Sequence, residues 1–309
     1  MGQHGGPVNT AIHPESPLAP ARQLFRSALI STAGHCKIAC GFCFRADRAH
    51  GFLDISTYTR TLSRLKEIGA EAICLTGGEP THHPELRQLV RLAHQFGIPV
   101  SIVTSARDPD DVDRLADVGR LLANVTVSAD SAGAMELGRT TRSVASAVVT
   151  LERIPTPEKV LHLTYWKLTA DECQDVYERV DASGVQIQLS PVALDDTTRQ
   201  RVGCTFYEYL AQHREDAALL SRYFQFTSRF QKHLTTLRGM HLYPERRSSC
   251  VSAALYVSAN GEIRRCPYGK SGVSVHAPRA EISRFLHAGP RDRTTPECAA
   301  ICRADDTCE

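Results

Sequence analysis

Three cysteines near the start of the chain have a spacing suited to metal ligation. Cys36, Cys40 and Cys43 stand in the order C-x-x-x-C-x-x-C, directly after a short segment at 27–31 that is typical of a strand. Three thiolates on so short a loop can hold three irons of a cubane cluster and leave the fourth iron without a protein ligand. An open iron can bind a substrate or a cofactor. Zinc ligation and simple packing of thiols are the alternatives, because zinc also takes closely spaced cysteines.

A second group of cysteines lies near the end of the chain. Cys250 and Cys266 flank a predicted hairpin with an Asn-Gly turn at 260–261, which should bring the two thiols together. Three more follow: Cys298, Cys302 and Cys308. Five cysteines would compete for the four ligand places of one further cluster, so one thiol could be spare or one iron open. Zinc is again the alternative.

The composition sets the context for these cysteines. Eleven cysteines without a signal peptide favour metal ligation in a reducing cytoplasm over a disulfide framework. The formal net charge is +2 with no block of lysine and arginine, so nothing indicates nucleic acid or an anionic membrane as a partner. No apolar run approaches the roughly 18 residues of a membrane span.

The elements that must position the cysteines form a regular alternation. Short apolar runs alternate with helical patterns from residue 24 onward, which indicates repeated βα units. We expect strands at 27–31, 72–75, 100–104, 124–128, 160–163 and 185–189, and helices at 56–69, 84–96, 108–121, 141–153 and 170–182. Six such units predict an α/β fold with a partial (β/α)6 TIM-like barrel, in which ligands gather at the carboxyl ends of the strands.

The chain divides into four predicted segments. These are a flexible tail at 1–22, the barrel at 23–200, a helical connection at 201–245 and a small cysteine-rich domain at 246–309. Two cysteines of the barrel, Cys74 on a strand and Cys173 on a helix, are expected to be small core hydrophobes.

Two motifs together resemble the radical S-adenosylmethionine (SAM) superfamily. One is the first cysteine motif with Phe42 before its third cysteine, and the other is Gly77-Gly78-Glu79-Pro80 after the second strand. The resemblance implies a 4Fe-4S cluster on Cys36, Cys40 and Cys43 whose open iron is chelated by SAM. One electron, from a donor such as flavodoxin or ferredoxin, would cleave SAM to a 5'-deoxyadenosyl radical. That radical would abstract a hydrogen atom from the substrate.

The same resemblance implies which residues contact SAM. The glycine-rich motif would offer backbone carbonyls and the Glu79 carboxylate to the ammonium group, and glycine permits that close approach. The ends of later strands would contact the carboxylate, the ribose hydroxyls and the adenine: Thr104, Ser105, Ser128, Asp130 and 189–192.

The second cysteine group resembles that of SPASM/twitch-type radical SAM enzymes. The count fits one auxiliary 4Fe-4S cluster, the twitch arrangement, held by four of Cys250, Cys266, Cys298, Cys302 and Cys308. The spacing of the last three cysteines departs from the usual C-x-x-C start of that tail, so the ligand assignment stays open.

The expected substrate is a small molecule. Peptide-modifying relatives often carry a leader-binding domain before the barrel, whereas this chain has about 22 residues there. The size resembles aminoglycoside and aminocyclitol enzymes such as neomycin C epimerase and 2-deoxy-scyllo-inosamine dehydrogenase. We therefore expect epimerisation of a sugar carbon in antibiotic biosynthesis, with Cys250 or Cys204 as hydrogen donor. A dehydrogenase, a peptide-modifying maturase and a non-catalytic metal-binding protein are the alternatives.

Further residues are candidates for binding this substrate. Carboxylates could hold the ammonium groups of an amino sugar: Asp195, Asp196, Glu208 and Glu245. Others qualify by their placement after strands: His82, His83, Tyr165 and Trp166.

Overall fold

Six parallel strands form the centre of the molecule, as the alternating pattern predicts. The computed structural model describes residues 26–34, 36, 40, 43, 51–137, 142–192, 200, 202–225, 249–250, 254–265, 271–288 and 291–292. The six strands are β1 (Ser27–Ala33), β2 (Ala72–Gly77), β3 (Val100–Thr104), β4 (Asn124–Asp130), β5 (Glu158–Tyr165) and β6 (Gln186–Pro191). They pair in sequence order, each parallel to the next. The predicted α/β fold with a partial barrel is confirmed.

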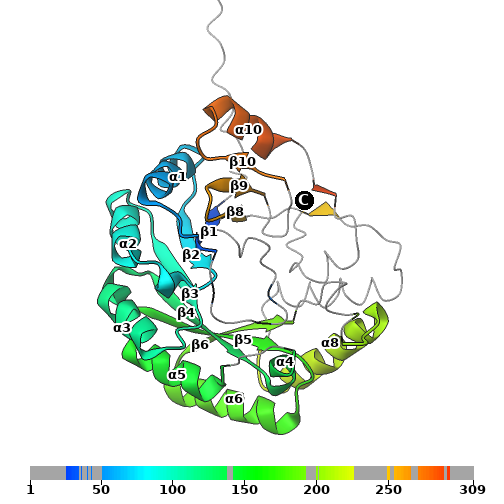
Figure 1. Cartoon of the computed structure of the whole chain (residues 1–309). Coiled ribbons are helices and arrows are strands. Elements are labelled where there is room, and N and C mark those ends of the chain that lie inside the picture. Colours follow the sequence, from blue (N-terminus) through cyan, green and yellow to red (C-terminus); the bar gives the residue numbers. More distant parts are fainter. Residues whose placement is uncertain are drawn as a thin grey trace, which may run out of the picture.

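The connecting helices cover the outer, convex side of this curved sheet (Figure 1). They are α1 (Ile55–Glu67), α2 (Leu86–Gln95), α3 (Pro109–Val118), α5 (Val144–Arg153) and α6 (Ala170–Ser183), with short turns η1 (Pro80–His82), η2 (Gly119–Leu121) and α4 (Ala132–Met135). Local chemistry sets their ends. The side chain of Asp54 accepts a hydrogen bond from the Thr57 N–H at the start of α1, and Gly184 ends α6 with φ 66°.

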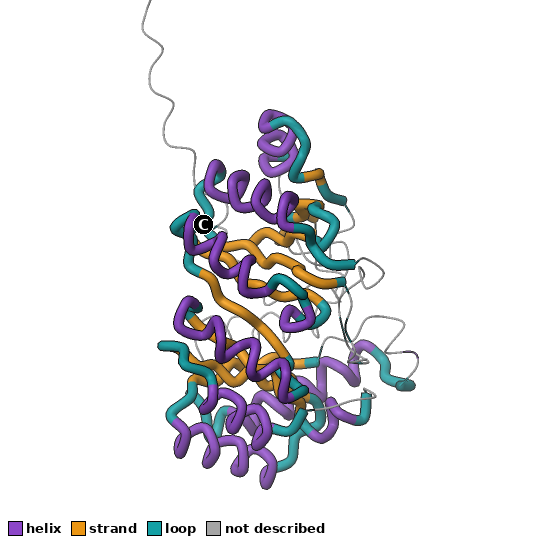
Figure 2. Tube along the Cα trace, turned by 60° about the vertical axis from the view of Figure 1, so that its left-hand side comes forward, coloured by secondary structure: helices purple, strands orange, loops and turns teal. Residues whose placement is uncertain are grey.

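The core lies between the strands and these helices. Along β4 and β5 the side chains that face the helices are buried and apolar, such as Val125, Val127, Leu161 and Leu163. Figure 2 shows the strands lying behind the layer of helices. Because successive side chains of a strand point to opposite faces, the alternate residues face the concave side of the sheet.

A hairpin from the last fifth of the chain extends the same sheet. β8 (Ala254–Val257) and β9 (Glu262–Arg264) form the predicted antiparallel hairpin, and β10 (Val273–Ser274) adds a third strand. The sequence did not indicate that β8 pairs in parallel with β1, from Ser27↔Ala254 to Ile30↔Val257. Helix α10 (Arg279–His287) follows, and β7 (Ser249–Cys250) pairs with β11 (Arg291–Asp292).

Part of the helical connection is described as α8 (Phe206–Leu220). Asp216 on this helix accepts hydrogen bonds from the N–H groups of Lys167 and Leu168, which fixes α8 to the end of β5. The predicted region 226–245 lies outside the described residues. Within the described chain, no helix has both the length and the apolar character required to cross a membrane.

Candidate active site at the carboxyl ends of the strands

The first cysteine group follows the carboxyl end of β1. Cys36, Cys40 and Cys43 are partly buried and free of disulfides. The N–H of Cys43 donates to the carbonyl of Cys40 at 3.2 Å, so the backbone turns between them. Three thiols so close in sequence are a suitable ligand set for three irons of a cubane. The remainder of the motif, including Phe42, lies outside the described residues.

The glycine turn, Gly77–Pro80, lies against the start of the cysteine loop. The N–H of Gly78 donates to the carbonyl of Ala33 at 2.5 Å. Gly77 has φ 139°, and a Cβ at this position would lie 2.8 Å from the Ala33 carbonyl oxygen and 3.0 Å from the Thr32 nitrogen. Only glycine fits, because the space that a side chain would need is filled by the backbone of β1. The glycine turn therefore packs against the end of β1, directly before the cysteine motif.

Glu79 is a buried carboxylate, 2% exposed, held by donors from two elements. Its Oε1 accepts from the Thr81 hydroxyl at 2.8 Å and from the Thr104 hydroxyl at 2.5 Å. Its Oε2 accepts from the N–H and the hydroxyl of Ser105 at 2.9 and 2.5 Å. Of the expected SAM contacts, the structure therefore brings Glu79, Thr104 and Ser105 together. A contact between Glu79 and an ammonium group stays a prediction.

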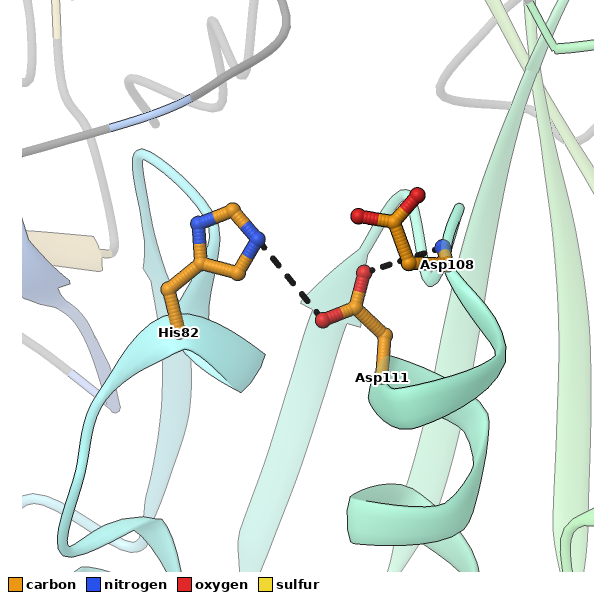
Figure 3. A group of neighbouring side chains, drawn as sticks. All are labelled: His82, Asp108 and Asp111. Carbon is orange, nitrogen blue, oxygen red and sulfur yellow. Dashed lines mark hydrogen bonds and ion pairs between the residues drawn. The ribbon is translucent and has the colours of Figure 1, made fainter.

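A second carboxylate, that of Asp111, shares the Thr81 hydroxyl with Glu79. The Thr81 hydroxyl also lies 2.7 Å from Oδ1 of Asp111, which is 3.7 Å from Nε2 of His82 (Figure 3). Oδ2 of Asp111 accepts from the N–H of Asp108, which closes a capping box at the start of α3. His82, Asp108 and Asp111 offer ligand atoms within 4.8 Å of one another. The capping box accounts for both aspartates without a metal ion.

His83 anchors the glycine turn from the other side. It is buried; its Nδ1 accepts from the N–H of Glu85 at 3.0 Å, so Nε2 donates to the Leu53 carbonyl at 2.8 Å. Burial lowers the pKa of His83, which agrees with a neutral ring. Arg114 donates to the carbonyls of Thr81 and His83. His83 therefore has a structural role in holding this turn.

Arg142 is a functional candidate that the sequence did not single out. The guanidinium is 7% exposed and donates from Nη2 to the Ala106 carbonyl at 2.7 Å and the Thr150 hydroxyl at 2.9 Å. Its buried Nε and Nη1 atoms find no acceptor among the described residues. Burial lowers the pKa of Arg142, while the carboxylates of Glu79, Asp111 and Asp130 oppose that shift. Unsatisfied N–H groups on a buried cation suit an anion such as a carboxylate.

Asp130, an expected SAM contact, lies beside this arginine at the end of β4. Its backbone N–H donates to the Arg142 carbonyl at 2.9 Å. Burial raises the pKa of Asp130 to about 6. Ser128, the other expected contact on β4, is partly exposed on the same face of the strand.

Several candidates by placement do not face the concave side. Tyr165 is 1% exposed within the core under the helices, and Trp166 is 4% exposed in a second cluster, stacked on Tyr209. Alternation explains this, because Tyr165 shares the helix side of β5 with Leu161 and Leu163. Glu208 caps α8 by accepting from Thr205, so this expectation of a substrate contact is replaced by a structural role.

The three isolated cysteines differ in their surroundings. Cys173 is a buried core residue, as expected, and burial raises its pKa to about 11. Cys74, also expected to be a small core hydrophobe, is partly exposed, and burial raises the pKa of its thiol to about 12. Cys204 packs against the cluster around Trp166, and its thiol donates to the Thr205 carbonyl at 3.4 Å.

Most of the expected auxiliary ligands fall outside the described part of the chain. The backbone of Cys250 lies in β7, opposite Arg291. The other four, Cys266, Cys298, Cys302 and Cys308, lie outside the described residues, as do Asp195, Asp196 and Glu245.

Comparison with known proteins agrees with this geometry. Residues 30–135 match the model of the Radical SAM superfamily. The S-adenosylmethionine-dependent nucleotide dehydratase of Thermoplasmatales archaeon (strain ISO4-H5) is 35% identical over 117 residues, 37% of this chain and 42% of the relative. PqqA peptide cyclase of Ruegeria pomeroyi is 33% identical over 98 residues, 30% of this chain and 26% of the relative. The matches thus span less than half the length of these curated relatives.

Solved structures share the fold. SuiB of Streptococcus suis bound to S-adenosylmethionine superposes with a TM-score of 0.60 at 18% identity, covering 82% of this chain and 63% of SuiB. Residues 30–135 therefore resemble a radical SAM domain, and the cofactors of such a domain are a 4Fe-4S cluster and SAM. Three free thiols that are close in sequence and a buried guanidinium with unsatisfied N–H groups are donors that suit that pair of cofactors.

Proposed function

We propose that this protein is a radical SAM enzyme that modifies a peptide. The observation that carries the radical chemistry is the hydrogen bond from the Gly78 N–H to the carbonyl of Ala33, the last residue of β1 before the cysteine motif. The peptide substrate is supported by PqqA peptide cyclase among the relatives and by SuiB, which has also been solved with its precursor peptide SuiA. The expectation of a sugar or aminoglycoside epimerase finds no support among these relatives, so the peptide-modifying alternative takes its place.

Different residues would bind the cluster and SAM. Cys36, Cys40 and Cys43 would hold the cluster, which supplies the electron that cleaves SAM when both are bound. Arg142 would hold the SAM carboxylate through Nε and Nη1, and Asp130 would accept from the ribose hydroxyls. Thr104 and Ser105 fix the Glu79 carboxylate, so that its position does not depend on the ligand.

Anaerobic SAM cleavage tests the radical chemistry. Reconstituted protein with dithionite should form 5'-deoxyadenosine and show an electron-paramagnetic signal that SAM perturbs. Replacing Cys36, Cys40 and Cys43 by alanine should abolish both. Cys173→Ala is the matched control, because Cys173 is a buried thiol distant in sequence from the motif, and it should retain both signals. A signal that persists without the three cysteines would contradict the proposal.

An auxiliary 4Fe-4S cluster on Cys250 and the later cysteines remains part of this proposal, as does an external electron donor such as flavodoxin or ferredoxin. Iron per chain measures the cluster. Wild-type protein should bind about eight irons, two cubanes, and the variant without Cys36, Cys40 and Cys43 about four. An iron content of about four in the wild type would exclude the auxiliary cluster.

A nucleotide is the second candidate substrate. The relative with 35% identity is a nucleotide dehydratase, and its match covers more of this chain than that of the cyclase. Incubation with ribonucleoside triphosphates and with candidate precursor peptides, followed by product mass, separates the two. Loss of water from a nucleotide would support the dehydratase. A change in the mass of a peptide, such as the loss of hydrogen, would support peptide modification.

The fate of the substrate radical defines the finer alternatives. An epimerase returns a hydrogen to the carbon, for which Cys250 or Cys204 remains the proposed donor, whereas a dehydrogenase passes an electron to the auxiliary cluster. Reaction in deuterated water should place one solvent deuterium on an inverted carbon. A product lighter by two hydrogens without deuterium would indicate oxidation.

A further inference from the structure

The concave face of β5 and β6 is polar and accessible. Apolar Leu161, Ile187 and Leu189 pack toward the helices, so the residues between them face the concave side. We name four of these inward residues the concave wall: His162, Thr164, Gln188 and Ser190. All four are at least partly exposed, and Gln188 is the most open of them.

Strand register places the wall in two rows that continue from β4. His162 pairs with Ser128 of β4 and with Gln188 of β6. One step closer to the carboxyl edge, Thr164 pairs with Asp130 and with Ser190. Adjacent strands lie about 4.8 Å apart, so each row spans roughly 10 Å, about the length of three residues of extended peptide.

Polar side chains on the inside of a barrel require an explanation. Barrel interiors are usually filled by layers of Val, Ile and Leu. Here, among the described inward positions of 126–130, 160–164 and 186–190, Val160 is the apolar exception. A polar, partly exposed interior indicates a binding surface and not a packing layer.

Hydrogen bonding orders one part of this wall. Nε2 of His162 lies 2.7 Å from the hydroxyl of Ser190, across the two strands. The amide of Gln188 makes no hydrogen bond to the described part of the chain and is exposed, so both its N–H and its carbonyl are available.

The charge of the wall selects among ligand classes. The same described inward positions carry no lysine or arginine, while Asp130 adds a carboxyl group at the carboxyl edge. A phosphate needs cations or a helix N-terminus, and a surface with an acid and without cations disfavours it. Neutral amide groups, which both donate and accept, match histidine, glutamine and hydroxyl side chains.

We propose that the concave wall binds backbone amide groups of the substrate, with Gln188 and His162 in direct contact and Ser190 positioning the His162 ring. This inference rests on the proposed function and narrows it, because it assigns the substrate surface to β5 and β6. Ser190 also lies within 189–192, where a SAM contact is expected, so the wall borders the SAM contacts expected on β2, β3 and β4. The substrate class is an extended peptide segment of about three residues.

Binding of a minimal peptide tests the wall. The probe is N-acetyl-alanyl-alanine N-methylamide, applied to anaerobically reconstituted, SAM-loaded protein and followed by equilibrium dialysis. Gln188→Ala and His162→Ala should each weaken binding about ten-fold, the effect of one lost hydrogen bond. Gln186→Ala is the matched control, since Gln186 lies on the same strand and face, one inward position farther from the carboxyl edge. It should retain binding within about two-fold.

Two measurements separate orientation from contact. Ser190→Ala should weaken probe binding less than His162→Ala, and the double variant should match His162→Ala, because Ser190 acts through the ring. The His162 ring resonances should shift in Ser190→Ala and not in Gln186→Ala. Additive effects of the two substitutions would overturn the positioning role.

The outcomes distinguish this inference from the proposed function. If wild-type protein cleaves SAM but does not bind the probe, the wall proposal fails alone. Equal binding by the Gln188 and Gln186 variants would also overturn it, as would binding of ribonucleoside triphosphates in place of the amide probe. If SAM is not cleaved at all, the proposed function itself fails.

Discussion

The hydroxyl of Thr104 lies 2.5 Å from Oε1 of Glu79, and it joins the end of β3 to the turn after β2. A short bond to a buried carboxylate contributes more than a neutral one. Thr104→Val, which keeps the shape but removes the donor, should lower the free energy of unfolding by about 1.5–3 kcal/mol. It should also weaken SAM binding. Thr104→Ser should retain both properties, and urea denaturation with SAM titration measures them. Equal effects of valine and serine would contradict the role of the hydroxyl.

Arg142 provides a second prediction for SAM binding. Lysine cannot place N–H groups at both the Nε and Nη1 positions, so Arg142→Lys should weaken SAM binding by at least about ten-fold. Arg153→Lys is the control, since Arg153 forms an exposed ion pair with Asp113 at 3.2 Å and such pairs contribute little. Equilibrium binding of SAM to reconstituted protein gives the comparison. An unchanged SAM affinity of Arg142→Lys would contradict the proposed contact between Arg142 and the SAM carboxylate.

The raised pKa of Asp130 predicts that the free energy of unfolding and the SAM affinity both depend on pH. Burial raises its pKa from 3.8 to about 6, so the folded protein binds a proton more tightly than the unfolded chain. The free energy of unfolding therefore falls as pH rises between these two values, and Asp130→Asn should remove that fall. The ionised carboxylate accepts hydrogen bonds from ribose hydroxyls best, so SAM affinity should rise through about pH 6 in the wild type. A flat wild-type profile would contradict the assignment.

At Gly77, the addition of one methyl group should lower the free energy of unfolding substantially. Gly77→Ala must displace the backbone of Ala33 and Thr32, so it should lower the free energy of unfolding by more than about 2 kcal/mol. Gly97 also has a positive φ, 69°, but no atom lies within 4 Å of the place that a Cβ would occupy there. Gly97→Ala should therefore cost only about 1 kcal/mol, the penalty of its backbone conformation. Similar costs at both sites in chemical denaturation would show that the close approach is unimportant.

Local patterns predicted the barrel well. The strand at 100–104 has the predicted bounds, and the helix predicted at 170–182 is α6, Ala170–Ser183. The cysteine motif and the glycine turn were also identified from sequence, because their chemistry depends on residues close together in the chain. These features need only short-range information.

Other features depend on contacts that no local pattern reports. The parallel pairing of β8 with β1 joins distant segments. Arg142 is a single arginine with no motif around it, and only its burial without acceptors marks it. The substrate class cannot be read from local patterns either, because sugar and peptide chemistry can use the same polar groups and the sequence holds no motif for either.

The position of β1 between β2 and β8 has a consequence for biosynthesis. While the ribosome is still adding the last fifth of the chain, one edge of β1 has no neighbouring strand, and its N–H and carbonyl groups can pair with another nascent polypeptide. Chaperone demand should therefore be greatest just before residues 254–257 emerge, and translation that stops short of them should yield aggregates.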